Sequence, residues 1–501
     1  MTTPAPLDLR DRDALFDALG ARTFDLAIIG GGITGAGIAR DAAMRGLSVA
    51  LIEARDFASG TSSRSSKMIH GGLRYLAQGD LALVREAASE RKIVQAIAPY
   101  LAREMPFVIP ARNAAAIAKL RAGLWAFEKL GGVPNSRKHE VWSQADLAAR
   151  EPTLKTDDLA GAVVYPEYLT DDARLTLANI RSAAARGALA VNYAAAAAIV
   201  SDGDRAAAID VVDTLTGATG RSARLTARVI VNAAGPWVDA VRALEDGAAT
   251  PRLTLAKGVH VVVPRRRLPV DRTVIFPAAD RRSVFAVPRG DVSYIGTTDT
   301  LYADADEWPT VTGADVDYLL SATARHFSVA PLTRAVVVSV WSGVRPLVRE
   351  EGKSTSDTSR RDEVWTGPGG VLSVAGGKLT AYRKMAQRLV DTVETTLGRK
   401  PSACRTAHEP LIGGDAPPPG AGSDPAVEAA HAVTHEGVLT LEDYWVRRSA
   451  RAWFDLDGGM AALGPAATAM APLLGWSADR IAQEISGCRA VRADLMAAVR
   501  G

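Results

Sequence analysis

The chain has 501 residues, of which 48% are hydrophobic, and a formal net charge of +3. Such a chain is long enough for two or three globular domains, and its nearly balanced charges give no reason to expect nucleic acid as a partner. The two cysteines, Cys404 and Cys488, have neither disulfide-framework nor metal-ligand spacing. We therefore expect no bound metal and a reducing, cytoplasmic compartment.

The N-terminal segment does not have the pattern of a targeting sequence. Acidic residues are distributed through "MTTPAPLDLRDRDALFDALG", which has no apolar core. No uninterrupted apolar stretch reaches the roughly 18 to 20 residues that a membrane-spanning helix needs. Any membrane contact is therefore expected to be peripheral, at the inner face of the cell membrane. The arginines of "PRRRLP" (264–269), with Arg281 and Arg282, could touch anionic lipid, although such runs are more often solvated faces.

Residues 24–56, "FDLAIIGGGITGAGIARDAAMRGLSVALIEARD", have the pattern of an apolar strand, a glycine-rich turn, a helix and a second apolar strand. Gly30, Gly32 and Gly35 satisfy GxGxxG, in which the glycines permit a tight turn, close approach to a pyrophosphate and close helix–strand packing. The helix N-terminus favours the phosphates. Glu53 ends the second strand, where a carboxylate can bind ribose hydroxyls and would repel a 2′-phosphate. This favours FAD or NAD over NADP, and the motif alone does not separate the first two.

A polar loop, "FASGTSSRSSKMIHGGLRYL" (57–76), follows the second strand. Its backbone N–H groups and the hydroxyls of Thr61, Ser62 and Ser66 could bind phosphate or ring atoms. The alternative is a solvated, serine-rich loop.

Beyond this loop the pattern changes along the chain. Residues 76–150 are expected to be largely helical, because "ALVREAASERKIVQAIA" and "AIAKLRAGLWAFEKLGG" have helical periodicity. From about residue 252 to residue 345, apolar runs separated by Pro, Asp and Gly turns predict a mostly antiparallel sheet. A Pro/Gly-rich linker and amphipathic helices follow. The predicted domains are residues 20–250 for nucleotide binding, completed by 346–400; 251–345 for a sheet covering the substrate; 413–425 for the linker; and 426–501 for a small helical domain.

A series of motifs resembles the FAD-dependent glycerol-3-phosphate dehydrogenase family of the aerobic, quinone-linked type. The most specific are "SSKMIHGGLRYL" (65–76) and "GGKLTAYR" (376–383). The resemblance implies an α/β fold with an FAD-binding Rossmann-like domain, an antiparallel-sheet substrate domain and a small C-terminal helical domain. The other matching motifs are the glycine turn with its two strands, "DDARLTLAN" (171–179), "VNAAGPW" (231–237), "KGVHVVVP" (257–264), "IGTTDT" (295–300) and "SGVRPLV" (342–348).

The implied activity is oxidation of sn-glycerol 3-phosphate to dihydroxyacetone phosphate by hydride transfer to FAD, with the electrons passed to a quinone. The family also suggests peripheral membrane contact and a homodimer. A glycerol-3-phosphate oxidase that uses oxygen would share nearly every motif. An amino-acid or 2-hydroxy-acid oxidase of the same fold is a second alternative, and a non-catalytic nucleotide-binding subunit is a third.

A phosphorylated substrate needs several cations of fixed geometry, and arginine suits phosphate because its planar fork can bind two oxygens. Arg345 stands in the apolar run "VVVSVWSGVRPLV", where a buried guanidinium calls for an anionic partner. The family pattern has one arginine where this chain has two, Arg360 and Arg361, and the spacing from Arg345 favours Arg360. By resemblance, the substrate residues are Arg74, Tyr75, Arg345, Arg360 and Lys378.

The residues that would bind the flavin are likewise implied by the resemblance. They include a second helix N-terminus, at residues 377–380, that is expected to point at the flavin ring. Negative charge develops on that ring when it accepts a hydride, and a helix N-terminus stabilises such charge. Removal of the hydroxyl proton needs a base, for which His70 and His260 are candidates. Arg345 could instead stabilise an alkoxide. The expected cofactor residues are Gly30, Gly32, Gly35, Glu53, Thr61, Ser62, Ser66, Lys67, Ala233, Gly235, Gly377, Lys378, Leu379 and Thr380.

Overall fold

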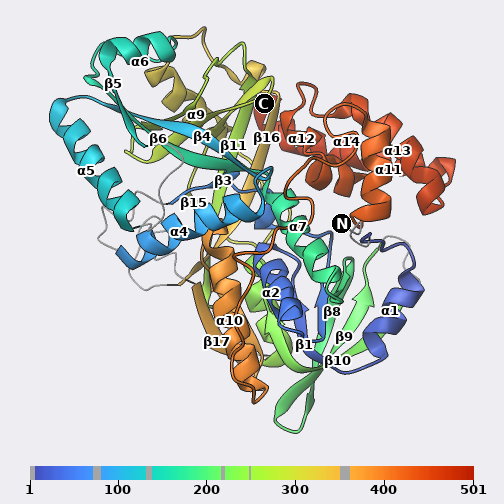
Figure 1. Cartoon of the computed structure of the whole chain (residues 1–501). Coiled ribbons are helices and arrows are strands. Elements are labelled where there is room, and N and C mark those ends of the chain that lie inside the picture. The colour runs from blue at the N-terminus through green and yellow to red at the C-terminus, as the bar shows by residue number, and fades with distance from the viewer. Residues whose placement is uncertain are drawn as a thin grey trace.

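A computed structural model describes residues 6–71, 81–130, 138–215, 220–247, 250–349 and 362–500. Two β-sheets stand one above the other in Figure 1, the first in the lower half of the view and the second in the upper half. The helices at the end of the chain, drawn in red, lie beside both. No helix of the described residues is long and apolar enough to cross a bilayer.

The first sheet contains the predicted strand–helix–strand unit. Strands β1 (Phe24–Ile29) and β2 (Val49–Ile52) are parallel, and helix α2 (Ile33–Met44) connects them. All four residues of β2 are buried, which is typical of a parallel strand covered on both faces. The sequence prediction for this unit is confirmed.

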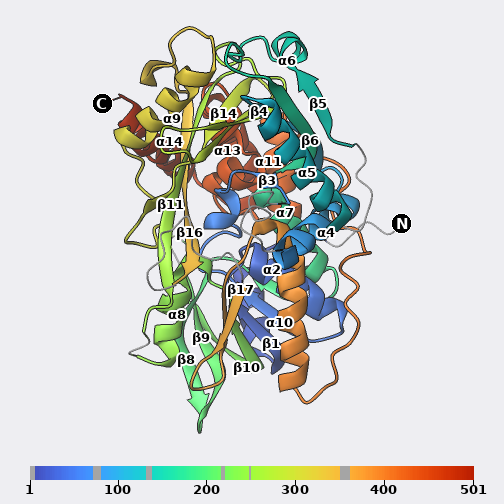
Figure 2. The ribbon, with the colours of Figure 1, turned by 90° about the vertical axis from the view of Figure 1, so that its left-hand side faces the viewer.

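The first sheet has the strand order β17-β18-β10-β1-β2-β7, and a β8–β9 hairpin joins it at β10. Strands β10 and β18 are parallel to their inner neighbours, and β17 is antiparallel to β18. Helices α2, α7 and α10 pack on one face (Figure 2), and α1 packs on the other. The bounds are α1 Arg12–Gly20, α7 Asp172–Ala184, β7 Leu189–Val191, β8 Ala194–Asp202, β9 Arg205–Asp213, β10 Ser222–Asn232, α8 Val238–Glu245, β17 Asp362–Thr366, β18 Leu372–Gly376 and α10 Tyr382–Thr396.

The second sheet has the strand order β15-β11-β14-β13-β12-β4-β6-β3, with β16 added on β11 and β5 on β6. Its pairs are antiparallel except β4 with β12, as predicted for a mostly antiparallel sheet. The bounds are β3 Met68–Ile69, β4 Ala102–Ala111, β5 Glu140–Ser143, β6 Gly161–Thr170, β11 Leu253–Pro264, β12 Thr273–Pro277, β13 Ser283–Arg289, β14 Val292–Gly296, β15 Thr300–Leu301, α9 Gly313–His326 and β16 Ser339–Val348.

The second sheet is larger than predicted, because β3 to β6 lie outside residues 251–345. Within 76–150, helices α4 (Leu81–Ile97), α5 (Ala114–Leu130) and α6 (Gln144–Arg150) agree with the expected helical character, whereas β4 and β5 contradict it. Strand β4 contains two prolines, which usually argue against a strand. Its pairing along the whole of β6 outweighs that local signal.

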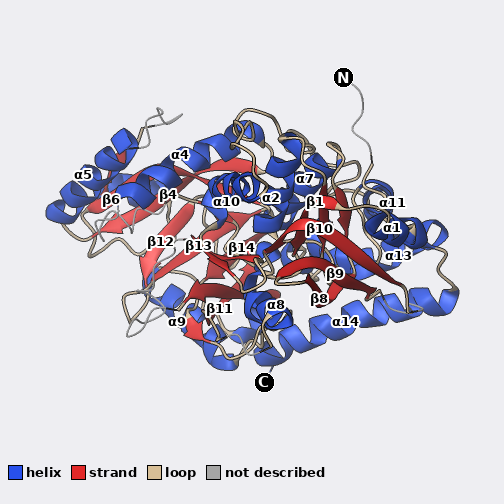
Figure 3. Cartoon of the chain, turned by 90° about the horizontal axis from the view of Figure 1, so that it is seen from below, coloured by secondary structure: helices blue, strands red, loops and turns tan. Residues whose placement is uncertain are grey.

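The C-terminal helical module, residues 425–500, packs against both sheets. Figure 3 shows α14 as a long helix along one side of the molecule, and its Met496 and Val499 enter the core of the second sheet. The preceding segment, 413–425, is irregular as predicted, and Gly414 accepts a hydrogen bond of 2.8 Å from the Tyr100 N–H. The module contains α11 (Pro425–His435), the π-helical turn η5 (Asp443–Arg448), α12 (Arg451–Phe454), α13 (Met460–Leu474) and α14 (Ala478–Arg500).

Candidate active site

A cavity of about 350 Å³ is lined by residues of both sheets. This volume lies in the range of small-molecule sites. Most of the predicted residues meet there, although they come from segments far apart in the sequence. Those in the wall are Gly30, Gly32, Glu53, Thr61, Ser62, Ser66, His70, Ala233, Gly235, His260, Arg345, Gly377, Lys378, Leu379 and Thr380.

The glycine turn forms one end of the cavity. Gly30 has a φ of +113°, and a Cβ there would lie 2.5 Å from the Ala233 carbonyl oxygen. A Cβ on Gly35 would lie 2.0 Å from the Gly30 oxygen, so the third glycine of the motif allows α2 to start against the turn. The first residue before α2, Gly32, has no capping side chain, and the helix N-terminus borders the cavity.

Glu53 lies in the cavity wall at the end of β2, as expected. Its carboxylate accepts hydrogen bonds from the N–H groups of Gly31, at 2.7 Å, and Arg55, at 3.0 Å. Withdrawal from water raises the pKa of Glu53, and the two N–H donors oppose that shift. Each oxygen keeps a lone pair, so the carboxylate can still accept from a ribose hydroxyl.

The hydroxyl groups of the polar loop are used largely within the protein. Thr61 Oγ1 donates to the Val344 carbonyl at 2.5 Å, and Ser62 Oγ accepts from the Ile33 N–H at 2.9 Å. The loop is therefore not a solvated segment: these bonds tie it to β16 and to the start of α2.

Lys67 was expected at the cofactor, but its side chain does not border the cavity. The ammonium lies 2.6 Å from Asp172 Oδ1 and donates to the Ser63 carbonyl at 2.9 Å. Asp172 also accepts from the N–H and hydroxyl of Ser65. The buried pair is the physical reason for the difference, because Asp172 fixes the ammonium beneath the loop and Lys67 supports it from there.

His70 and the 376–380 segment lie together in the cavity wall, where Thr380 Oγ1 donates to the His70 carbonyl at 3.0 Å. The next N–H, of Gly71, donates to Glu167 Oε1 at 3.0 Å. A short 3-10 helix, η4 (Leu379–Ala381), begins there without a capping side chain, and its first residues border the cavity.

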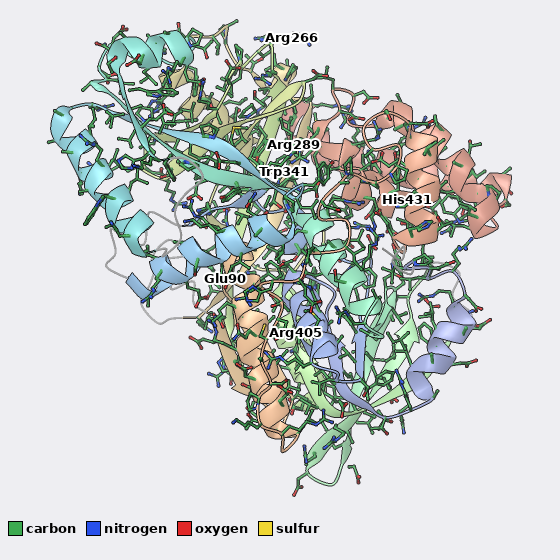
Figure 4. The ribbon with its side chains drawn as sticks, in the orientation of Figure 1. Glu90, Arg266, Arg289, Trp341, Arg405 and His431 are labelled. Atoms are coloured by element: carbon green, nitrogen blue, oxygen red, sulfur yellow. The ribbon has the colours of Figure 1, made fainter. Side chains whose placement is uncertain are left out.

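His260 is 2% exposed and is held more tightly than a typical catalytic histidine. Its ring stacks on Trp341 with centroids 4.6 Å apart, and Nε2 lies 2.9 Å from Ser66 Oγ. Burial lowers the pKa of His260 well below its usual value, and the nearby charges of Arg345 and Lys67 lower it further. The ring is therefore neutral at physiological pH. Figure 4 shows Trp341 near the centre of the molecule, between the second sheet and the C-terminal helices.

Arg345 lies on β16 and borders the cavity, with its side chain 21% exposed. Nη1 is 3.1 Å from Asp299 Oδ1, and Nη2 donates to Thr297 Oγ1 at 3.1 Å. A Cβ on Gly258 would lie 2.3 Å from Nη2, so that glycine makes room for the guanidinium. The anionic partner expected for this arginine is present within the protein, and the pair fixes the fork at the cavity wall.

Four of the sequence candidates, Arg74, Tyr75, Arg360 and Arg361, lie outside the described residues. Their assignment to the substrate stays a prediction, as does the choice between the two adjacent arginines.

Arg64 is a cavity-wall residue that the sequence analysis missed. It is 3% exposed, and its guanidinium carbon lies 3.7 Å from the centroid of the Trp308 ring. Neither Nη1 nor Nη2 has a hydrogen-bond partner among the described residues, and burial lowers the pKa of Arg64 to about 10. No sequence signal separates such an arginine from a surface one, because the residue stands in a polar loop.

The cavity fits a flavin dinucleotide. Its glycine turn leaves no room for side chains, which suits a pyrophosphate beside the N-terminus of α2. Glu53 suits the ribose, and the N-terminus of η4 would hold the ring end. When bound, FAD would supply the two-electron acceptor that the amino-acid side chains lack.

Comparisons with known proteins agree with this interpretation. Residues 25–383 match the model of the FAD dependent oxidoreductase family, and residues 423–481 match the C-terminal domain of alpha-glycerophosphate oxidase. The chain is 42% identical, over 400 residues, to an aerobic glycerol-3-phosphate dehydrogenase of Staphylococcus aureus strain MRSA252. That match covers 78% of this chain and 71% of the relative.

Solved structures show the same relationship. The glycerol-3-phosphate dehydrogenase of Bacillus halodurans, solved with FAD, aligns with a TM-score of 0.79 and 30% identity over 97% of this chain and 98% of its own. Glycine oxidase of Geobacillus kaustophilus aligns with a TM-score of 0.58 and 23% identity over 78% of this chain and 98% of its own, which shows a shared fold. The chain belongs to the FAD-dependent oxidoreductases and, among them, to the aerobic glycerol-3-phosphate dehydrogenases.

Proposed function

We propose that this enzyme oxidises sn-glycerol 3-phosphate to dihydroxyacetone phosphate and passes the electrons, through FAD, to a quinone. The observation that carries the proposal is that His70, Arg345 and Lys378 border the same cavity as the glycine turn. These residues come from a loop, a strand of the second sheet and a helix start. Their types match the need of an anionic alcohol for cations and a base.

Arg345 and Lys378 hold the substrate anion in this proposal. Arg345 is already oriented by Asp299 and Thr297, so little side-chain entropy is lost when it binds. Arg74, Tyr75 and Arg360 complete the phosphate site according to the family resemblance. FAD, when bound, would supply the acceptor for the hydride of the alcohol, and a protein base would take the hydroxyl proton.

We assign the base to His70 rather than His260. Both histidines border the cavity, but His70 is half-buried whereas His260 is 2% exposed. His260 Nε2 is engaged by Ser66, and its Nδ1 is buried without a hydrogen-bond partner among the described residues. The depressed pKa of His260 also makes it the weaker base. His260 is assigned the role of fixing Ser66 at the cavity.

Anaerobic addition of glycerol 3-phosphate to the purified holoenzyme tests the proposal. We expect the flavin absorbance to bleach. Bleaching by an amino acid but not by glycerol 3-phosphate would favour the oxidase alternative, and no bleaching by either would favour a non-catalytic subunit. Turnover with a quinone analogue compared with oxygen then separates a dehydrogenase from a glycerol-3-phosphate oxidase.

Peripheral contact with an anionic membrane is assigned to helix α5, at the edge of the molecule in Figures 1 and 3. Its Trp125 is 59% exposed, and Lys119, Arg121 and Lys129 are exposed beside it. Tryptophan with cations suits a lipid interface.

The arginines that the sequence suggested for lipid contact are less available. Arg265 lies 2.8 Å from Asp271, and Arg282 lies 3.4 Å from Asp280. Arg266, at the outer edge in Figure 4, provides a control. In flotation with phosphatidylglycerol vesicles, the double variant Trp125→Ser, Lys129→Ser should bind less than the unsubstituted enzyme, and Arg266→Ser should bind equally well. Equal vesicle binding by all three proteins would exclude α5 as the contact.

Sedimentation of the same three proteins without vesicles tests the expected homodimer.

A further inference from the structure

A short segment after Glu53 supports the glycine turn. The Ala58 N–H donates to the Gly31 carbonyl at 3.1 Å, and the Gly31 N–H donates to Glu53 Oε2 at 2.7 Å. Phe57 packs directly against Gly31, because a Cβ there would lie 2.6 Å from the Phe57 ring. The peptide groups of Gly31 are therefore held by residues 53–58.

Asp56, within that segment, is fully buried and is bound by the C-terminal helical module. Arg448 makes a two-pronged contact, with Nη1 2.7 Å from Oδ2 and Nη2 2.8 Å from Oδ1. Arg447 Nε donates to Oδ2 at 2.6 Å. Both arginines belong to the π-helical turn η5, some 390 residues further along the chain, as the sequence separations of 391 and 392 show.

The charges around Asp56 form a network. Arg447 Nη2 also donates to Asp443 at 2.8 Å, and the Tyr193 hydroxyl donates to the same carboxylate at 2.6 Å. Arg447 Nη1 donates to Glu442 at 2.9 Å, so three carboxylates surround the two guanidinium groups. Burial raises the pKa of Asp56, but the two guanidinium groups outweigh it and leave the pKa lowered, so the carboxylate is ionised in the folded protein.

We propose that the C-terminal helical module positions the FAD site: Arg447 and Arg448 fix Asp56, and through Phe57 and Ala58 they fix the glycine turn that binds the pyrophosphate. The proposal rests on the FAD site described above. Removing one guanidinium leaves the buried Asp56 charge incompletely compensated, which favours movement of the segment toward water. The contacts on Gly31 would then be lost, although neither arginine touches the cavity. Arg447 and Arg448 are positioning residues in this scheme.

Binding of FAD to the apoprotein tests this role. The variants are Arg448→Met, Arg447→Met and, as a matched control in the same module, Arg451→Met, whose partners are Glu428, Tyr444 and Asp455. Flavin fluorescence titration should show the Kd for FAD raised about tenfold in Arg448→Met and by less than about twofold in Arg451→Met. With saturating FAD, the KM for glycerol 3-phosphate should be unchanged in both.

Arg447→Met, which removes only one of the three arginine contacts with Asp56, should raise the Kd by an intermediate factor and provides the test should Arg448→Met fail to fold. The unfolding temperatures of the apoproteins show whether a variant is less stable in general, which separates that effect from a specific loss of positioning at the FAD site. A Kd for FAD that is unchanged in the Arg447 and Arg448 variants, or raised equally in the control, would overturn the proposal. Failure of the unsubstituted apoprotein to bind FAD would instead overturn the proposed function.

Discussion

Two parts of the cavity wall are built in different ways. The first, the glycine-turn end, is made mainly of backbone: Gly30 and Gly35 exclude side chains, and one carboxylate, Glu53, comes from the adjacent strand. The second, the side-chain end, is made of His70, Arg345 and Lys378, which come from distant segments and border the same cavity. A side chain added at the glycine turn clashes with the backbone itself. A substitution of His70, Arg345 or Lys378 instead removes the contribution of that one side chain and leaves the others in place. Substitutions at the two ends should therefore fail differently.

The largest effect is expected from Gly35→Val. Even a single Cβ would lie 2.0 Å from the Gly30 carbonyl oxygen, which belongs to the rigid turn and cannot move aside without disturbing it. We expect purified protein without bound flavin and without activity. The control is Gly187→Val, at a position where a Cβ meets no atom within 4 Å. Because Gly187 has a φ of +86°, this control reports the effect of backbone strain without the clash. Bound flavin in Gly35→Val at the unsubstituted level would contradict the backbone account of this end.

The same contrast explains what could be predicted from the sequence. The strand–turn–helix unit is a local pattern, so about thirty residues of periodicity and spacing are enough to predict its strands and its helix, and Gly30, Gly32 and Glu53 border the cavity. Strand β4 was missed because its two prolines are a local signal against a strand, and only its pairing with β6 overrides them. Local periodicity does not report a partner that lies elsewhere in the chain.

The side-chain end could be anticipated only through family motifs, and the motifs do not say where a side chain points. Lys67 stands in the most specific motif, yet Asp172, more than a hundred residues away, draws its ammonium under the loop. Arg64 and the pair Arg447 and Arg448 had no signal at all, because burial of an arginine depends on contacts made after folding. Contacts of this kind are the part of the site that the sequence did not reveal.

The next largest effect is expected from His70→Asn, which removes the proposed base. The kcat/KM for glycerol 3-phosphate should fall by about 10² to 10⁴, the usual contribution of general base catalysis, and the acid limb of its pH profile should disappear. His260→Asn should lose less than about tenfold and keep the acid limb, since its ring is neutral and engaged by Ser66. Steady-state kinetics across pH would reverse the assignment if only the His260 variant lost the limb.

Arg345→Met should lower kcat/KM by about 10² to 10³, because one oriented guanidinium at a developing or fixed negative charge contributes that much. FAD should remain bound, which distinguishes this end from the glycine turn. Asp299→Asn provides the matched control: it keeps Arg345 but removes the carboxylate 3.1 Å from it, so we expect a smaller loss. Flavin loss from Arg345→Met would mean that the two ends are not independent.

The smallest effect on activity is expected from Glu436→Gln, which lies in neither end. Glu436 forms a buried two-pronged pair with Arg174 at 2.6 and 2.7 Å. Burial raises the pKa of Glu436, but the charge and hydrogen bonds of Arg174 outweigh it and lower the pKa from 4.5 to about 2. A folded-state pKa below the unfolded value means that this group stabilises the fold above about pH 4.5 and loses that contribution as the pH falls toward 2. The full contribution is about 3 kcal/mol, of which about 2 kcal/mol is lost by pH 3.

Urea unfolding of the enzyme and of Glu436→Gln between pH 6 and pH 3 measures this contribution. At neutral pH the variant should be less stable by about 3 to 5 kcal/mol, because Arg174 is left buried without its partner, while the kcat of the folded variant is unchanged. The difference in free energy of unfolding should shrink by about 2 kcal/mol at pH 3, where Glu436 is protonated in the unfolded chain but still largely ionised in the folded one. A difference that stays constant with pH would show that Arg174 does not hold the carboxylate ionised. A fall in kcat would show that this part of the C-terminal module is coupled to the side-chain end of the cavity as well as to the glycine turn.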